Sequence, residues 1–510
     1  MKASPSARWL ALVLVGCAAE RGGHDEPTSA ASATATMAAT EEPAPSASAP
    51  LHASAPPAAS DETASVPALE APDWPSADQR AVGLPAPVTG DRIYSKSRHL
   101  WIRSQPGGKG EDWMGYLSLG DSIRVRDGDA KRAHVARGEG SWCREWYAVE
   151  PRGFVCTGME GTLDANDPEI VELVRTRANT RSPWPYRYGE SLGAAVASRL
   201  PEARGGAASS TRPALFPMNP AGRSLFHDIA AGSTVAYTDA FEHDGKPYLL
   251  TWDRGIVEQS RVKPYPESPF HGLPLGGELA LPLAFVRADE GAEVLRREPD
   301  GTLVATGTTL PRLAWATLTG RTEGEGRARA HETRDGRWLR GGELAIARQA
   351  PVVPPMVATS GGRKTWVDIS LFAGTLVAYE DEKPVYATLV SPGRGGPPVP
   401  GKTTLSTAST PIGTYAVLGK FTTATMISST VSTLVHTEVQ YTQNFEGPYS
   451  LHGAYWHDRW GLKKSAGCVN LAPIDAHRLF AWTDPPLPEG WHGMKSTSDT
   501  RARTLVNIRR

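Results

Sequence analysis

The segment from Tyr449 to Leu471 constrains this chain more than any other. It carries His452 followed by Gly453, and sixteen residues later it carries Cys468 preceded by Gly467. A cysteine thiolate is a strong nucleophile, and a nearby imidazole can accept the thiol proton. Glycine before the cysteine lets the backbone turn sharply, so that a substrate carbonyl can approach main-chain N–H groups. A fold that uses this segment for catalysis must bring His452 and Cys468 together.

The segment resembles the signature of the L,D-transpeptidase catalytic-domain family of the YkuD type. That signature reads His-Gly, a spacer, and then Ser-His-Gly-Cys followed by Val or Ile and by Asn or Arg. In this chain Ala466 stands where the family usually has histidine. The catalytic histidine of the family matches His452, so the pair of catalytic residues is kept. The change to Ala466 instead affects how the loop before Cys468 is held and how reactive the Cys468 thiol is.

The resemblance extends over residues 364–510 and implies a mainly β fold, a sandwich of sheets with one short helix. Three earlier phrases keep the order of the family: an opening strand at 366–371, a Val-Ser-Pro-Gly segment at 390–393 and a Thr-Pro-Ile-Gly-Thr-Tyr strand within 410–418. The alternation of apolar residues in the first of these phrases is typical of a strand.

The pattern of residues predicts further elements in this domain. Runs at 375–380 and 384–390 predict a hairpin, and 504–508 predicts a closing strand. Pro473 suits the first turn of a helix, which Pro485 and Pro486 would end. The residues expected on one face of this helix are Ile474, Leu479 and Trp482.

The chemistry expected from the motif is nucleophilic. Cys468 attacks a peptide carbonyl and forms a thioester, while His452 accepts the thiol proton and then protonates the leaving amine. Main-chain N–H groups of Gly467 and Cys468 are candidates for an oxyanion hole. The resemblance implies that the carbonyl of Gly453 orients the imidazole ring. Ser465 is expected to form a hydrogen bond within the loop.

Five other residues are candidates for supporting roles. Asn470 matches the polar position of the family after the cysteine and is expected to hold the loop or the substrate. Tyr455 and Trp456 lie between the two catalytic residues, where they either cover the substrate or serve as packing residues. His457 and His436 are candidates to take the place of the missing histidine, although a single histidine is more often structural.

The resemblance implies a peptidoglycan substrate and no metal or cofactor. A tetrapeptide stem would be cut after its third residue with release of D-alanine and joined to the side-chain amine of a neighbouring stem as a 3-3 crosslink. Acylation by carbapenem-type β-lactams is also implied. Two rival enzymes use the same thioester: an L,D-carboxypeptidase gives it to water, and an attachment enzyme gives it to a lipoprotein amine. The remaining alternative is a non-catalytic wall-binding lipoprotein, which would be expected to lose the nucleophile first.

The N-terminal part predicts export and anchoring. Residues 1–17 combine a positively charged start with an apolar run too short to span a bilayer. The run ends at Gly16-Cys17, which looks like a bacterial lipobox, so acyl chains on Cys17 would hold the protein on a membrane. An ordinary secretory signal is the alternative. Residues 18–80 are rich in Ala, Ser and Pro and predict a disordered tether. The expected location is the cell envelope, as a periplasmic, membrane-anchored lipoprotein.

Two accessory regions are expected between the tether and the catalytic domain. Residues 85–165 show short alternating runs, a small β-barrel pattern that resembles bacterial SH3-like wall-targeting domains. Cys143 and Cys156 in this region suggest two adjacent strands joined by a disulfide, which suits an oxidising compartment. The aromatic residues of the region either bind stem peptides or form its core. Residues 166–355 predict one or two further β-rich modules.

Composition sets outer limits on function and fold. The formal net charge is −1, so no basic field argues for nucleic acid. The 51 glycines and 43 prolines favour turn-rich β architecture over long helices. No metal-ligand spacing, Walker loop or dinucleotide fingerprint stands out. The predicted fold is therefore mainly β, with small SH3-like modules before a β-sandwich-like catalytic domain.

Overall fold

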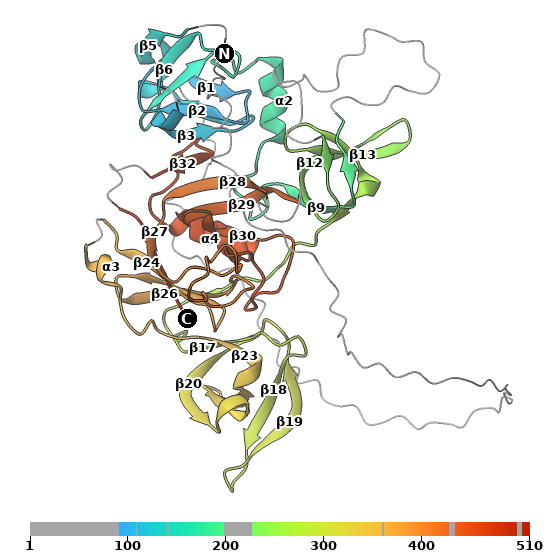
Figure 1. Ribbon diagram of the computed structural model, residues 1–510, viewed down its shortest axis with the longest axis vertical. Helices are drawn as coiled ribbons and strands as arrows, with labels where there is room; N and C mark the ends of the chain where they lie inside the picture. The colour runs from blue at the N-terminus through green and yellow to red at the C-terminus, as the bar shows by residue number, and fades with distance from the viewer. Residues whose placement is uncertain are drawn as a thin grey trace, which may run out of the picture. The chain divides into compact units, whose positions relative to one another are not determined.

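The computed structural model describes residues 91–108, 110–139, 142–197, 227–359, 362–427, 434–496 and 502–510. Within these ranges the chain is mainly β, with four α-helices, which confirms the predicted fold class (Figure 1). The predicted export signal with Cys17 and the predicted tether lie outside the described residues. None of the described helices is long and apolar enough to cross a membrane.

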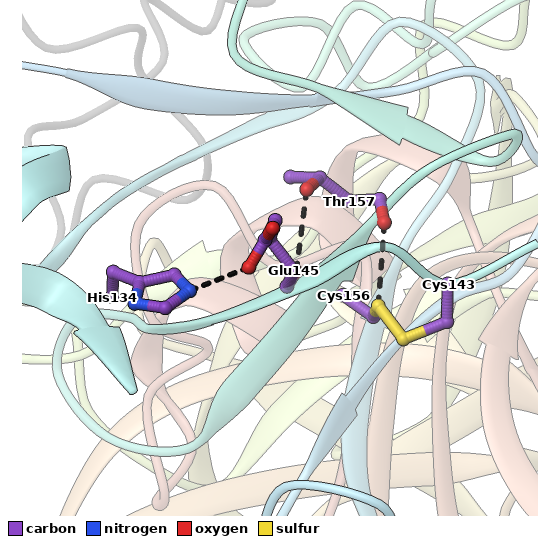
Figure 2. Close-up of a disulfide and its surroundings, with 5 residues drawn as sticks. All are labelled: His134, Cys143, Glu145, Cys156 and Thr157. Atoms are coloured by element: carbon purple, nitrogen blue, oxygen red, sulfur yellow. Dashed lines mark hydrogen bonds and ion pairs between the residues drawn. A yellow bond between two sulfur atoms is a disulfide. The ribbon is translucent and has the colours of Figure 1, made fainter. Parts of the chain in front are cut away.

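The first group of strands covers residues 91–165 and packs mostly antiparallel. Its strands β6 and β7 are neighbours, and a disulfide joins Cys143, just before β6, to Cys156 on β7. Figure 2 shows this disulfide beside the contact between His134 and Glu145. The elements are β1 (Arg92–Ser95), β2 (Leu100–Arg103), β3 (Trp113–Leu117), β4 (Ser122–Arg124), α1 (Ala130–Ala133), β5 (His134–Arg137), β6 (Glu145–Ala148), β7 (Phe154–Thr157) and β8 (Gly161–Thr162).

A second group follows the helix α2 (Pro168–Thr176). Asp167 caps this helix by accepting a hydrogen bond from the Glu169 amide. β9 pairs with β12 and β15, and β13 pairs with β12 and β14. The strands are β9 (Arg187–Ser191), β10 (Ala194–Ala195), β11 (Asp228–Ile229), β12 (Thr234–His243), β13 (Lys246–Thr251), β14 (Ile256–Glu258) and β15 (Val262–Pro264).

A third group forms a seven-stranded sheet in the order β19-β18-β22-β21-β20-β17-β23. Its buried side chains are mostly small and aliphatic. The strands are β17 (Leu283–Val286), β18 (Ala292–Arg297), β19 (Leu303–Leu310), β20 (Trp315–Glu323), β21 (Ala330–Thr333), β22 (Trp338–Arg340) and β23 (Leu344–Ala347). The short helix α3 (Pro355–Thr359) follows this sheet.

The C-terminal domain is built from two sheets that share the long strand β26. One sheet runs β16-β26-β25-β24-β33-β27, and the other runs β26-β31-β30-β29-β28-β32. The elements are β16 (Leu273–Pro274), β24 (Thr365–Ser370), β25 (Thr375–Glu380), β26 (Lys383–Ser391), β27 (Gly413–Ala416), β28 (Gly419–Ile427), β29 (Val435–Glu446), β30 (Tyr449–Gly453), β31 (Val469–Leu471), β32 (Gly493–Lys495) and β33 (Leu505–Arg509). The predicted β-sandwich is confirmed.

One strand in this domain is shorter than its sequence pattern suggests. The run 410–418 predicts a single strand, but β27 begins only at Gly413. Pro411 has no N–H to donate to a ladder, which keeps the strand from starting earlier. The predicted hairpin is present as β25 and β26, and the predicted closing strand is β33, which runs parallel to β24.

The helix α4 (Pro473–Trp482) begins at the predicted proline and packs beside β29 and β30. Leu479 and Trp482 are buried in the largest apolar cluster, which also holds Leu451 of β30 and Val469 of β31. These two strand residues alternate with the residues of the catalytic motif. Burying one face of β30 and β31 therefore fixes which side chains point to the other face.

Candidate active site

The parallel strands β30 and β31 bring the two parts of the motif together. His452 lies opposite Asn470 in their register. Because side chains two residues apart share a face of a strand, Ser450 lies on the same face as His452, and Cys468 on the same face as Asn470. Ser450 Oγ lies 3.6 Å from Cys468 Sγ, as this register requires. We call these four residues the active-site face.

His452 is buried and held in one tautomer. Its Nδ1–H donates a 2.9 Å hydrogen bond to the carbonyl of Gly453, the orienting group expected from the sequence. The other ring nitrogen, Nε2, has no hydrogen-bond partner among the described residues. Burial lowers the pKa of His452 to about 4, although the bond to Gly453 acts in the opposite direction. The ring is therefore neutral at pH 7, with a lone pair on Nε2 that can accept a proton.

Cys468 is 1% exposed and lies just before β31. Its Sγ lies 3.8 Å from the carbonyl oxygen of Pro448. Since only a thiolate can attack a carbonyl, chemistry at Cys468 requires that its thiol lose a proton.

The loop before the nucleophile is shaped by Ser465 and Gly467. The Ser465 hydroxyl donates to the carbonyl of Cys468 and accepts a 3.0 Å hydrogen bond from the amide of Gly467. The backbone amide of Ser465 also donates to the carbonyl of Pro392, which ties the loop to a neighbouring segment. Gly467 has a φ of +139°, and an added Cβ would lie 2.6 Å from the ring of Tyr449. Only glycine fits this position without strain.

The two histidines proposed to replace the missing one lie close to the active-site face. His457 Nε2 is 3.0 Å from the side-chain nitrogen of Asn470. The ring of His436 stacks on Trp456, with centroids 4.2 Å apart. Ala466 itself is buried within the loop. His457 thus meets the active-site face through Asn470, and His436 approaches it through Trp456.

The two aromatic residues between the catalytic pair have different surroundings. Tyr455 is buried, and its ring stacks on Tyr188 of β9 with centroids 3.7 Å apart. Its hydroxyl also lies 2.6 Å from the hydroxyl of Thr234 on β12. These contacts agree with the packing alternative for Tyr455. Trp456 is partly exposed, and its ring centroid lies 5.8 Å from that of His452.

The segment between the catalytic residues also contacts the third group of strands. Arg459 donates two hydrogen bonds, of 2.6 and 2.7 Å, to the carboxylate of Asp289. Arg312 donates a 2.7 Å hydrogen bond to the carbonyl of Asp458. Sequence reasoning missed these contacts because no local pattern marks them. It also missed Ser450, although a serine two residues before His452 in a strand shares its face.

Among the described residues, no group of three or more His, Cys, Asp or Glu side chains is placed to hold a metal ion. The site instead offers a cysteine sulfur, a neutral imidazole with an unpaired nitrogen, and a tightly bonded loop. These are the parts of a cysteine nucleophile with a general base.

Comparisons with known proteins find similarity over part of the chain. A comparison with curated proteins finds no match. Among solved structures, an L,D-transpeptidase (residues 123–326) from Xylanimonas cellulosilytica is 24% identical, with a TM-score of 0.21 and coverage of 32% of this chain and 64% of that one. An L,D-transpeptidase from Stackebrandtia nassauensis is 23% identical, with a TM-score of 0.20 and coverage of 30% and 57%. The catalytic domain of the E. faecium L,D-transpeptidase is 19% identical, with a TM-score of 0.21 and coverage of 29% and 99%.

The chain therefore spans less than two thirds of the first two of these structures. The family comparison is restricted to the C-terminal domain, where residues 364–507 match the family model described as "YkuD: L,D-transpeptidase catalytic domain". This stretch contains both sheets of the sandwich and the whole active-site face. The similarity of this chain to the YkuD L,D-transpeptidase family is therefore carried by residues 364–507.

Proposed function

We propose that this protein is a peptidoglycan L,D-transpeptidase that forms 3-3 crosslinks through a thioester on Cys468. The observation that carries the proposal is the active-site face, where β30 and β31 set His452 beside the strand that follows Cys468. The family match of residues 364–507 supplies the substrate class.

In the first half-reaction, the reduced Cys468 thiol loses its proton to Nε2 of His452 and its sulfur attacks the carbonyl of the third stem residue. The C–N bond to D-alanine breaks, and the His452 imidazolium returns the proton to the leaving amine. The amide N–H of Cys468 would stabilise the oxyanion, whereas that of Gly467, the other candidate from the sequence, is donated to the Ser465 hydroxyl. In the second half-reaction an amine of a neighbouring stem attacks the thioester, gives its proton to His452 and releases the Cys468 thiol.

The partners in this proposal are stem peptides of the wall, with anchoring to a membrane through Cys17. The acceptor distinguishes the proposal from its rivals: an L,D-carboxypeptidase uses water, and an attachment enzyme uses an amine of a lipoprotein. The tight packing of the segment between His452 and Cys468 supports a closed site that limits access of water to the thioester.

The test uses the full chain without residues 1–17, kept under reductant, and purified disaccharide-tetrapeptide muropeptides. Products are read by mass spectrometry beside a Cys468→Ala variant and a His452→Gln variant. We expect a dimer that lacks one D-alanine in the wild type and in neither variant.

Other products would change the assignment. A tripeptide monomer that depends on Cys468 would make the protein an L,D-carboxypeptidase. Product formation that persists in Cys468→Ala would exclude this cysteine as the nucleophile. No conversion of muropeptides by the wild type, even with a lipoprotein acceptor added, would contradict an acyl-transfer activity and favour the wall-binding alternative.

A further inference from the structure

The hydrogen bonds of His457 fix where its ring proton lies. The backbone N–H of Arg459 points at Nδ1 of His457, 3.2 Å away, so Nδ1 must accept. Burial, followed by the charge of Lys464 and the neighbouring histidines, lowers the pKa of His457, which leaves a single ring proton at neutral pH. That proton lies on Nε2, and Nε2 is therefore a donor.

The partner of Nε2 is the side-chain amide of Asn470, at 3.0 Å. With the amide nitrogen of Asn470 turned toward His457, two donors would face each other. The amide oxygen of Asn470 has no hydrogen-bond partner among the described residues, and Asn470 is 2% exposed. A rotation of the amide by about 180° removes the conflict between the two donors, because oxygen and nitrogen exchange places, and it leaves the NH2 group as the one without a partner.

In the rotated amide, the oxygen of Asn470 accepts from Nε2–H of His457. The NH2 group then occupies the place of the unpaired oxygen. Asn470 lies opposite His452 in the register of β30 and β31, and it shares the active-site face with Cys468. The side-chain NH2 of Asn470 is therefore a buried hydrogen-bond donor, two residues along the chain from the nucleophile Cys468.

We infer that Asn470 donates a hydrogen bond from its side-chain NH2 to a carbonyl oxygen of the bound stem peptide, and that His457 is the positioning residue that turns the amide this way. This inference rests on the proposed function. Asn470 and Cys468 are two residues apart in the chain, and in a strand this spacing separates their Cα atoms by about 6.6 Å. The Asn470 amide therefore lies beside the reacting bond and does not contact it. The donor thus holds the peptide beside the reacting carbonyl and contributes to binding of the stem more than to the chemical step.

The first test reads the tautomer directly. Full-length protein labelled with ¹⁵N on histidine side chains gives ring nitrogen shifts that distinguish Nε2–H from Nδ1–H, and His457 is assigned by comparison with a His457→Phe variant. We expect Nε2–H at neutral pH. An Nδ1–H tautomer would overturn the inference whatever the activity.

The second test measures KM and kcat on tetrapeptide muropeptides. We expect Asn470→Leu to raise KM about 10-fold, the equivalent of one hydrogen bond, with a much smaller change in kcat. His457→Phe should raise KM by several-fold, and His457→Gln, which keeps a donor at the same place, should restore it. The double variant Asn470→Leu/His457→Phe should be no worse than Asn470→Leu alone, because one residue acts through the other.

A matched control is His477→Phe, since His477 is a largely buried histidine on α4 that contacts the carbonyl of Thr180 and the ring of Tyr441. Its KM should stay at the wild-type value. Equal KM values for the wild type, His457→Phe and Asn470→Leu would overturn the inference and leave the proposed function standing. Absence of turnover in the wild type would contradict the proposed function, and the inference with it.

Discussion

At the scale of single residues, the site depends on a neutral imidazole and on one glycine with a positive φ. His452 is buried against the carbonyl of Gly453, so its charged form is disfavoured and Nε2 keeps its lone pair. Gly467 gives the chain a backbone angle that places its amide against the Ser465 hydroxyl. Both features can be tested one residue at a time.

The first prediction concerns the acid limb of activity. Because burial lowers the pKa of His452 to about 4, the base is already deprotonated throughout the pH range 5 to 7. The pH profile of kcat/KM on muropeptides should therefore lose activity with a midpoint near 4, well below the 6.5 of an ordinary histidine. Tryptophan fluorescence at each pH separates this loss from unfolding. If the folded protein instead loses activity with a midpoint at pH 6.5, the His452 ring is exposed to water in the active site.

The second prediction concerns Gly467→Ala. The new methyl would lie 2.6 Å from the ring of Tyr449, and the positive φ adds backbone strain. We expect a loss of stability of about 1–3 kcal/mol in urea unfolding and slower alkylation of reduced Cys468. The control is Gly401→Ala, since Gly401 also has a positive φ but no atom within 4 Å of its added Cβ. Equal effects of the two substitutions would show that the contact with Tyr449 is unimportant.

At the scale of elements, the site is carried by β30, β31 and the helix that follows. Lys420 on β28 is fully buried and donates hydrogen bonds to the carbonyls of Phe480 and Thr483, at the C-terminal end of α4. These carbonyls have no partner within the helix, and a cation at this end also interacts favourably with the helix dipole. Lys420 therefore fastens α4 to the sheet that carries His452.

The third prediction follows from this contact. Lys420→Met keeps the length of the side chain but removes the ammonium donor from both carbonyls, so that the Phe480 carbonyl keeps only a 3.4 Å hydrogen bond from the Thr483 hydroxyl, at a cost of about 2–4 kcal/mol in unfolding free energy. Chemical denaturation followed by circular dichroism measures this cost. Lys495→Met is the control: this lysine lies over the ring of Trp113 and should cost less than about 1 kcal/mol. Similar losses in both variants would argue against a special role for Lys420.

At the scale of the whole molecule, stability is linked to pH through buried histidines. His436 and His452 are both buried, and desolvation lowers their pKa values to about 3 and about 4, with each ring also near Trp456. His492 acts in the other direction. Burial alone would lower its pKa, but the hydrogen bond and charge of Asp121, together with Glu438, raise it.

The fourth prediction is the pH dependence of unfolding. The depressed pKa values mean that the unfolded chain binds more protons below pH 6.5, so the contribution of His436 and His452 is complete above 6.5 and is lost as the pH falls toward 3 to 4. Each should contribute about 1.4 kcal/mol per pH unit within that window. His492, with its raised pKa, contributes stability below 6.5 that is lost at higher pH.

Urea unfolding at several pH values between 4 and 8 measures this dependence. Below pH 6.5, His436→Gln should reduce the slope of the unfolding free energy against pH by the equivalent of about one proton. Above pH 7 the slope should stay unchanged. An unaltered acid slope in His436→Gln would show that His436 is protonated in the folded state.

The sequence by itself determined the local chemistry. The resemblance of residues 449–471 to a family signature pointed to Cys468, His452 and the glycines beside them, and alternation or proline placement located most strands of the catalytic domain and the start of α4 at Pro473. These are properties that a short stretch of chain carries on its own. Only the tertiary structure decided that Ser450 faces Cys468, that His457 meets Asn470, that Tyr455 stacks on Tyr188 and that Arg459 binds Asp289. Such contacts depend on strand register and on packing between segments far apart in the chain, which no local pattern encodes.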